Sequence, residues 1–156
     1  MWDDIKHLED LSSHIMRVRS NCFCLAKHFI SIDPVLSRKL AAQGMMHDNS
    51  KFYGKEAQFL HRGPDVPKLA LETTISWHVQ TNAHHPEFWL PSQGKIYMYK
   101  EFAYEMVCDL LARSQEFGTN LDEYLTQVHF KKYDFSNCTL KHIEEARSIL
   151  LPRKFQ

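Results

Sequence analysis

Apolar residues recur every three or four positions along most of the chain, which is the spacing of one buried face on an α-helix. One such stripe covers about residues 8–30 and a second covers about 34–48, where Asp33 and Pro34 offer a capping side chain and a first-turn proline. Further stretches with helical spacing cover about 67–78, 96–116, 120–131 and 138–150. The pattern predicts a chain that is helical almost throughout.

Two segments interrupt the helical pattern. Residues 49–66 contain Gly54, Gly63 and Pro64 and are expected to form a short helix followed by a loop. The segment TNAHHPEFWLPSQGK has two prolines and a glycine, which indicates an ordered loop with two adjacent histidines at its centre. Since the chain has no internal repeat, low-complexity tract or change of composition, we predict one all-α domain over residues 1–156.

Charge and cysteine content narrow the function classes. Nineteen basic residues balance nineteen acidic ones, so no overall field favours nucleic acid or an anionic membrane. The four cysteines form no CxxC pair, which argues against a zinc ribbon and favours reduced thiols. The N-terminus is acidic and polar, and no run of 18 apolar residues occurs, so we predict a cytoplasmic protein without a membrane segment.

The adjacent pair His47 and Asp48 ends the second predicted helix and is a candidate for metal binding. A divalent ion takes neutral imidazoles and carboxylates, so this pair supplies one of each if both side chains face the same cavity. A helix terminus permits that arrangement. The dipeptide is a weak signal by itself, because polar residues commonly end helices.

A hairpin of the first two predicted helices would determine which histidine lies beside His47. If the chain turns near residue 32, His14 and His47 differ in height by only about 4–5 Å at 1.5 Å per residue. By the same count, His28 would lie roughly 16 Å from the level of His47. We therefore expect His14 to be the partner and His28 to lie at the surface or the turn.

Other candidates lie further along the chain. Asp109 stands among apolar residues, where an unpaired carboxylate is costly, and Glu105 lies one helical turn before it. His78 ends the third main helix, and His84 and His85 follow in the loop. Each residue could instead be structural. Asp109 could accept a hydrogen bond from a buried Arg or Tyr, and His84 and His85 could be side chains on a loop without a role in binding. Trp77, Phe88 and Trp89 are expected to pack around them, and Glu87 could orient an imidazole.

Four segments of the sequence together resemble a known superfamily. They are HIMRV at 14–18, HDNSKF at 47–52, WHVQTNAHHPEFW at 77–89 and EMVCDLLA at 105–112. Their order of His, His-Asp, His, His-His and Asp is similar to that of the HD-domain superfamily of metal-dependent enzymes. More specifically, the motifs HDxSKF and NxHHPExW resemble an uncharacterised HD-like family of bacteria, phages and large viruses. The resemblance spans about residues 10–115.

The resemblance implies a helical bundle with one or two divalent ions. Mn, Fe, Co, Ni, Zn and Mg are all compatible with these ligands. The ligands that it implies for the first ion are His14, His47, Asp48 and Asp109. For a second ion it implies His78 with His84 or His85, bridged by Asp48. These histidines could instead contact a substrate phosphate.

The chemistry implied is hydrolysis of a phosphoester, with a nucleotide or another small phosphorylated molecule as substrate. Lys51 would stabilise charge on a phosphoryl oxygen, and His78, His84 or His85 would protonate the leaving oxygen. Two alternatives remain open: a diiron oxygenase built on the same ligands, and a metal- or nucleotide-binding module without enzymatic activity. The sequence also leaves a homodimer open.

Overall fold

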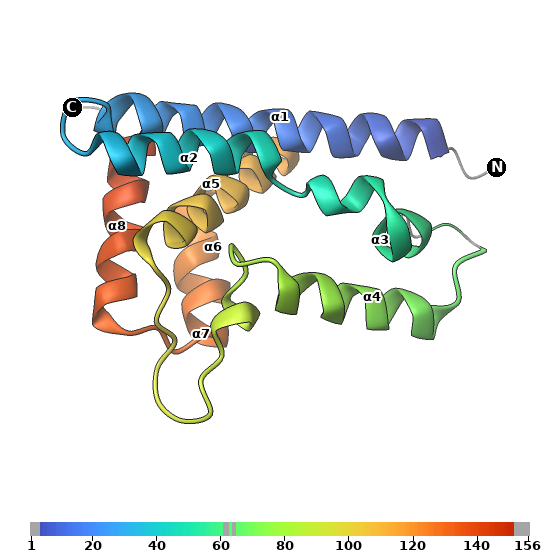
Figure 1. Cartoon of the computed structure of the whole chain (residues 1–156). Coiled ribbons are helices and arrows are strands. Elements are labelled where there is room, and N and C mark those ends of the chain that lie inside the picture. Colours follow the sequence, from blue (N-terminus) through green and yellow to red (C-terminus); the bar gives the residue numbers. More distant parts are fainter. Residues whose placement is uncertain (1–3, 61–62, 64, 152–156) are drawn as a thin grey trace.

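Two antiparallel helices, α1 (Asp4–Phe29) and α2 (Pro34–Met46), form a hairpin along one side of the molecule (Figure 1). Asp33 caps α2, because its Oδ1 accepts a hydrogen bond from the backbone N–H of Leu36 at 3.0 Å. The two helices approach closely at Gly44, where an added Cβ would lie 2.6 Å from Cβ of Cys22. The hairpin expected from the sequence is therefore present.

The computed structural model describes residues 4–60, 63 and 65–151. The ends of the predicted domain, and Pro64 of the predicted loop, lie outside these residues. After the hairpin the described elements are η1 (Asn49–Phe52), α3 (Gly54–Phe59), α4 (Lys68–Thr81), η2 (Pro86–Trp89), α5 (Lys100–Phe117), α6 (Leu121–Tyr124), η3 (Leu125–His129), α7 (Phe130–Lys132) and α8 (Asn137–Leu150).

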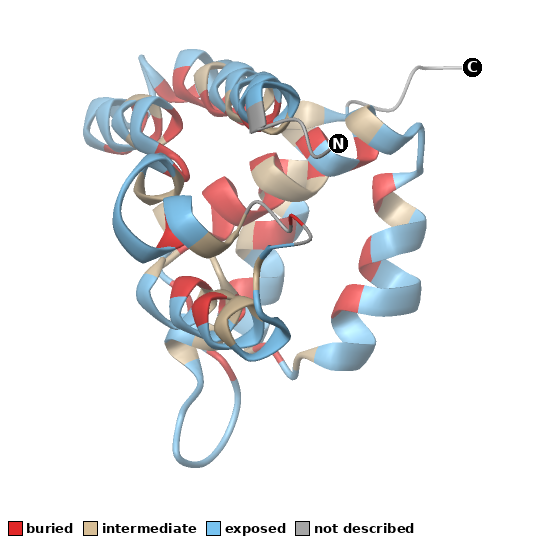
Figure 2. Cartoon of the chain, turned by 90° about the vertical axis from the view of Figure 1, so that its right-hand side faces the viewer, coloured by how far each residue is buried: buried red, intermediate tan, exposed pale blue. Residues whose placement is uncertain are grey.

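Helix α5 is the central element, and it packs against α1, α2 and α8. Buried residues lie on the inward faces of the helices and exposed residues on the outside, as Figure 2 shows. The apolar core is built from the hairpin, α5 and α8, and its fully buried members include Val18, Leu25, Leu40, Tyr104, Val107 and Ile143. This core fixes α5 relative to α1 and α2, which carry the candidate residues.

The helix predicted over 96–116 is wrong at its start, because α5 begins only at Lys100. Residues 96–99 are extended, with Ile96 and Met98 buried and the two tyrosines between and after them exposed. Ile96 forms a short parallel bridge with Phe135, in which its N–H donates to the carbonyl of Asp134 at 2.9 Å. Over only four residues, apolar positions that alternate along an extended strand also fit the spacing of a helix. The pattern therefore did not distinguish a strand from a helix.

The remaining predicted helices are present, and the predicted ordered loop contains a short 3-10 helix, η2. The helical stretch predicted at 120–131 is continuous through α6, η3 and α7, but its middle part, η3, is a π-helix. Trp89 packs against the core, but Trp77 and Phe88 are exposed and do not wall the site as expected. The all-α fold is confirmed, and none of the described helices is long and apolar enough to cross a membrane.

Candidate metal centre

Side chains from four parts of the fold converge between the hairpin, α4 and α5. His14 comes from α1, His47 and Asp48 follow α2, and Asp109 comes from α5. The remaining members come from the end of α4 and the loop after it, and they are His78, His84 and His85. All seven were candidates from the sequence, and the structure brings them into one cluster, which we call the His/Asp cluster.

The backbone after α2 explains how neighbouring residues face the same space. His47 leaves the helix with φ −50° and ψ 130°, and Asp48 then adopts the left-handed conformation with φ 53° and ψ 18°. Asp48 is the one residue other than glycine with positive φ among the described residues. Such conformations are uncommon and gather at functional sites. This turn brings both side chains into the cluster, where they are 3% exposed or less.

The first half of the cluster joins α1, α2 and α5. The rings of His14 and His47 have centroids 5.7 Å apart, as the hairpin geometry requires, whereas His28 is exposed. The Oδ1 atom of Asp109 lies 3.0 Å from His14 Nε2 and 3.9 Å from His47 Nε2. One ligand atom from each of these three residues lies within 4.8 Å of the others, so they could hold one ion.

The second half joins Asp48 to the histidines of α4 and its loop. Asp48 Oδ1 lies 3.3 Å from His78 Nε2 and 3.6 Å from His84 Nε2. Together with His85 these residues also offer ligand atoms within 4.8 Å of one another. The other oxygen of Asp48, Oδ2, lies 3.6 Å from His47 Nε2, so this carboxylate stands between the two halves.

Most of the unsatisfied buried polar atoms of the described chain lie in this cluster. Nine buried side-chain N or O atoms of the described residues lack a hydrogen-bond partner, and two of them, Gln43 Oε1 and Tyr104 Oη, belong to other residues. The other seven are the Nε2 atoms of the five histidines, Asp48 Oδ1 and Asp109 Oδ1. Buried polar atoms are normally paired, so seven lone-pair donors without partners in one place fit a cation site.

In four of these histidines the other ring nitrogen, Nδ1, contacts a carboxylate. Nδ1 of His14 lies 2.7 Å from Glu116 Oε1, and Nδ1 of His78 lies 2.7 Å from Glu56 Oε2. Glu105 Oε1 lies 3.0 Å from His47 Nδ1 and 3.5 Å from His84 Nδ1. A carboxylate on Nδ1 fixes the tautomer that leaves Nε2 free to bind a metal.

Sequence reasoning singled out Glu105 but missed Glu116 and Glu56. Glu116 carried a usable signal, because it lies seven residues, or two turns, after Asp109 on the same helix face. Glu56 carried none, since it lies in the short helix α3 and no sequence spacing relates it to His78. Glu87 does not orient a ring of the cluster, because its carboxylate accepts hydrogen bonds from Tyr133 and Lys132.

The ionisation of the cluster follows from burial and close charges. Burial by itself would lower the pKa of His47, but its hydrogen bond with Glu105 and the charge of Asp48 raise it to about 9. Burial would raise the pKa of Asp109, but the neighbouring His14 ring and the charge of His47 hold it well below its usual range. Without a metal, a protonated histidine thus offsets part of the buried negative charge.

Lys51 and His85 lie at the edge of the cluster. The Lys51 ammonium donates a hydrogen bond to Asp48 Oδ2, so in this structure it pairs with that carboxylate. The ring of His85 lies 4.2 Å from that of His84, and burial lowers the pKa of His85 to about 4. An imidazole that is neutral at physiological pH is suited to accept a hydrogen bond or bind a metal.

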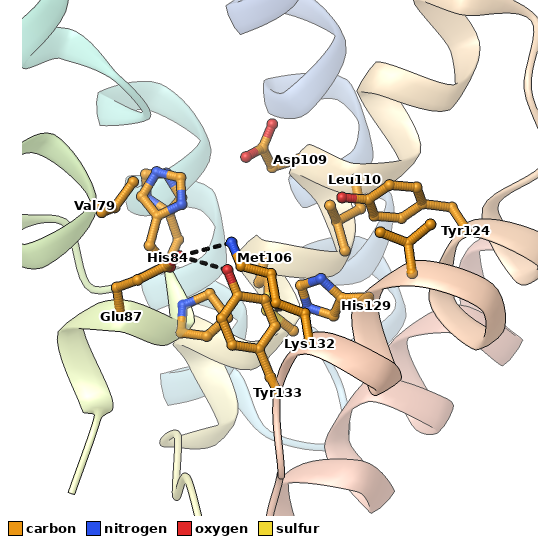
Figure 3. A pocket seen from close by; sticks show the side chains of 13 residues that line it. Val79, His84, Glu87, Met106, Asp109, Leu110, Tyr124, His129, Lys132 and Tyr133 are labelled. Carbon is orange, nitrogen blue, oxygen red and sulfur yellow. Dashed lines mark hydrogen bonds and ion pairs between the residues drawn. The ribbon is translucent and has the colours of Figure 1, made fainter. Parts of the chain in front are cut away.

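A cavity of about 230 Å³ adjoins the cluster at His84, His85 and Asp109. Its opposite wall is formed by the C-terminal segment that includes η3 and α7, for which sequence reasoning assigned no role (Figure 3). The cluster is therefore reachable from a space large enough for a small molecule.

Comparison with known proteins gives a family but no activity. No curated protein matches the chain, and no solved structure matches it. One family model matches residues 3–149, which is nearly the whole chain, and its description is a family of unknown function. The chain therefore belongs to this family of unknown function, DUF5662.

Proposed function

We propose that this protein is a metal-dependent phosphohydrolase that acts on a small phosphorylated substrate. The observation that carries the proposal is the convergence of seven buried, unsatisfied ligand atoms beside a cavity. Two divalent ions would account for all of them, with Asp48 as a ligand shared by both. His14, His47 and Asp109 would hold the first ion, and the second would lie with His78, His84 and His85.

The charge balance supports a resident cation. Asp48 and Asp109 lie in the cluster, and Glu56, Glu105 and Glu116 line its outer side. Lys51 pairs with Asp48, and Arg113 and Arg17 pair with Glu116. Among the described residues, Asp109, Glu56 and Glu105 therefore have histidines but no Lys or Arg as ion-pair partners. An excess of buried carboxylates is costly unless cations compensate it. Divalent ions would supply that compensation where the unsatisfied atoms point.

Several residues of the chain would then have separate roles in hydrolysis. Bound ions would supply Lewis acidity, which activates water and stabilises charge on a phosphoryl oxygen. Glu56, Glu105 and Glu116 would keep the protons of the ligand histidines on Nδ1, and Lys51 would hold Asp48 in place. The neutral ring of His85, between the cluster and the cavity, would accept a proton or bind the second ion. A relationship to the HD-domain superfamily fits this ligand order and is part of the proposal.

The direct test is turnover of simple phosphoesters by metal-loaded protein. Protein stripped with a chelator and reloaded in turn with Mn²⁺, Co²⁺, Ni²⁺ or Zn²⁺ should release nitrophenol from nitrophenyl phosphate or bis-nitrophenyl phosphate. Asp109→Asn should lose this turnover, and Glu72→Gln, an exposed change on α4, should keep it. No turnover with any metal contradicts the proposal. Two bound irons with consumption of dioxygen would instead favour the oxygenase.

A further inference from the structure

The cavity beside the His/Asp cluster has two unlike ends. One end is the cluster itself, through His84 and Asp109. The other end is formed by the segment from Tyr124 to Tyr133, which contributes five lining residues on one face. The segment includes the π-helix over Leu125–His129, and its neighbouring residues Val128 and His129 both line the cavity. π-Helical turns often occur at functional sites.

A charged bridge crosses the cavity between these two parts of the fold (Figure 3). The Tyr133 hydroxyl donates a hydrogen bond to Glu87 Oε1, and Lys132 Nζ donates to the same oxygen at 3.2 Å. Glu87 follows the two histidines of the loop, whereas its donors come from the C-terminal segment. The acid and the ammonium offset each other, so this end has no excess charge to attract a second charged group.

The rest of the lining is apolar on one side. Val79, Met106, Leu110 and Val128 present carbon and sulfur to the cavity. A group held here therefore meets an apolar surface along one face, with a carboxylate, a phenol and an ammonium along the other. This combination suits a carbon skeleton that carries hydroxyls, because a hydroxyl can donate to the carboxylate and accept from the ammonium.

The volume limits the size of that group. The cavity of about 230 Å³ is smaller than the roughly 300–1,000 Å³ typical of pockets for drug-sized ligands. It has room for a small organic group. The phosphate of the same molecule would lie at the cluster end.

We propose that this cavity binds the organic part of the substrate, and that this part is an uncharged, hydroxyl-bearing group such as a small sugar or polyol. Glu87 is the specificity-determining residue, since its carboxylate accepts from the hydroxyls. Tyr133 and Lys132 position Glu87. The inference rests on the proposed function, because the phosphate must bind at the His/Asp cluster.

The test is a matched pair of esters that differ only in hydroxyls. Glycerol phosphate and propyl phosphate share a three-carbon skeleton, so their binding to metal-loaded protein, measured by calorimetry, isolates the hydroxyl contribution. We expect glycerol phosphate to bind at least tenfold more tightly. In Glu87→Gln this preference should fall to about threefold or less, with propyl phosphate binding unchanged. Glu123→Gln, an exposed acid on α6, is the matched control and should keep the preference.

The outcomes separate this inference from the proposed function. Equal binding of the two esters by the wild type, or binding of neither, overturns the inference. A Glu87→Gln protein that loses both esters equally, or loses metal, overturns it too, because Glu87 would then be structural. If propyl phosphate and nitrophenyl phosphate are hydrolysed without any preference for hydroxyls, the phosphohydrolase stands and only the hydroxyl recognition fails.

Discussion

Helix α5 has two faces that contact opposite kinds of surroundings. One face carries Ala103, Val107 and Leu111 into the apolar core, where these side chains have no polar atoms to satisfy. The other face carries Glu105 and Asp109 to the His/Asp cluster. The apolar side stabilises the fold, whereas the cluster side places buried carboxylates beside the unsatisfied imidazoles of other elements, which is unfavourable without a ligand. The packed core therefore keeps in place a set of polar side chains whose burial is unfavourable by itself.

The largest effect is expected at Asp48, which stands between the two halves of the cluster. Asp48→Asn keeps a side chain that tolerates the left-handed backbone, but it removes the negative charge that would bridge two ions. We expect kcat/KM for nitrophenyl phosphate to fall on the order of a thousandfold, or about 4 kcal/mol. Steady-state kinetics beside a thermal melt would measure this. A loss of less than tenfold in a folded protein would exclude the bridging role.

The opposite face is tested at Leu40, which is fully buried in the core. Leu40→Ala should lower the free energy of unfolding by about 2–5 kcal/mol, because it leaves a cavity. Metal content per folded chain should stay the same. Urea unfolding with elemental analysis would measure both, and Leu69→Ala, at a residue 75% exposed, is the control, with an expected change within about 0.5 kcal/mol. Loss of metal in Leu40→Ala would mean that core and cluster are not separable.

A change at Glu105 tests whether the carboxylates on the outer side of the cluster affect its affinity for metal. It contacts Nδ1 of two ligand histidines, so Glu105→Gln should weaken metal binding about 10–100-fold without removing a ligand. Glu101→Gln lies one turn earlier on α5, where the acid pairs with Lys39, and should leave affinity unchanged. Competition with a chromophoric chelator would give both affinities. Equal losses of metal affinity in the two variants would show that the negative charge of α5 affects binding, and that the contact of Glu105 with the histidines does not.

The smallest effect is expected at His129, a buried histidine of a different kind. It stacks on Phe135, and burial lowers its pKa to about 4. Because the folded pKa lies below the unfolded value, its contribution to stability is present above about pH 6.5 and is lost as the pH falls toward 4.

His129→Phe should remove this acid sensitivity. Between pH 7.5 and 4.5, the metal-free variant should lose about 1–2 kcal/mol less stability than the metal-free wild type. Urea unfolding at both pH values, with chelator present, would measure the difference. Parallel losses in the two proteins would show that His129 already carries a proton in the fold.

The sequence allowed the helical frame and the members of the cluster to be predicted, for different reasons. The frame followed from apolar spacing and from Asp33 and Pro34, and the fit of His14 to His47 followed from counting residues about the turn. The extended run at Ile96 was misread because its bridge with Phe135 joins residues far apart in sequence. Pairing of that kind leaves no local pattern.

The outer carboxylates and the cavity wall were harder to foresee. Glu56 meets His78 only because α3 folds back on α4, and the sequence gives no spacing that relates them. Tyr133 and Lys132 reach Glu87 across 45 or more residues. Contacts of this kind depend on how elements pack and not on the period within any one of them.

Metal stoichiometry is the first test of the proposal that the cluster binds two divalent ions. Elemental analysis would compare the wild type, reconstituted and desalted, with His14→Ala, His78→Ala and the exposed control His28→Ala. We expect two ions per chain in the wild type and in His28→Ala, and a loss of at least one ion in each of the other variants. A wild type that retains no ion after reconstitution, or variants at His14 and His78 that retain as much as the wild type, would contradict it.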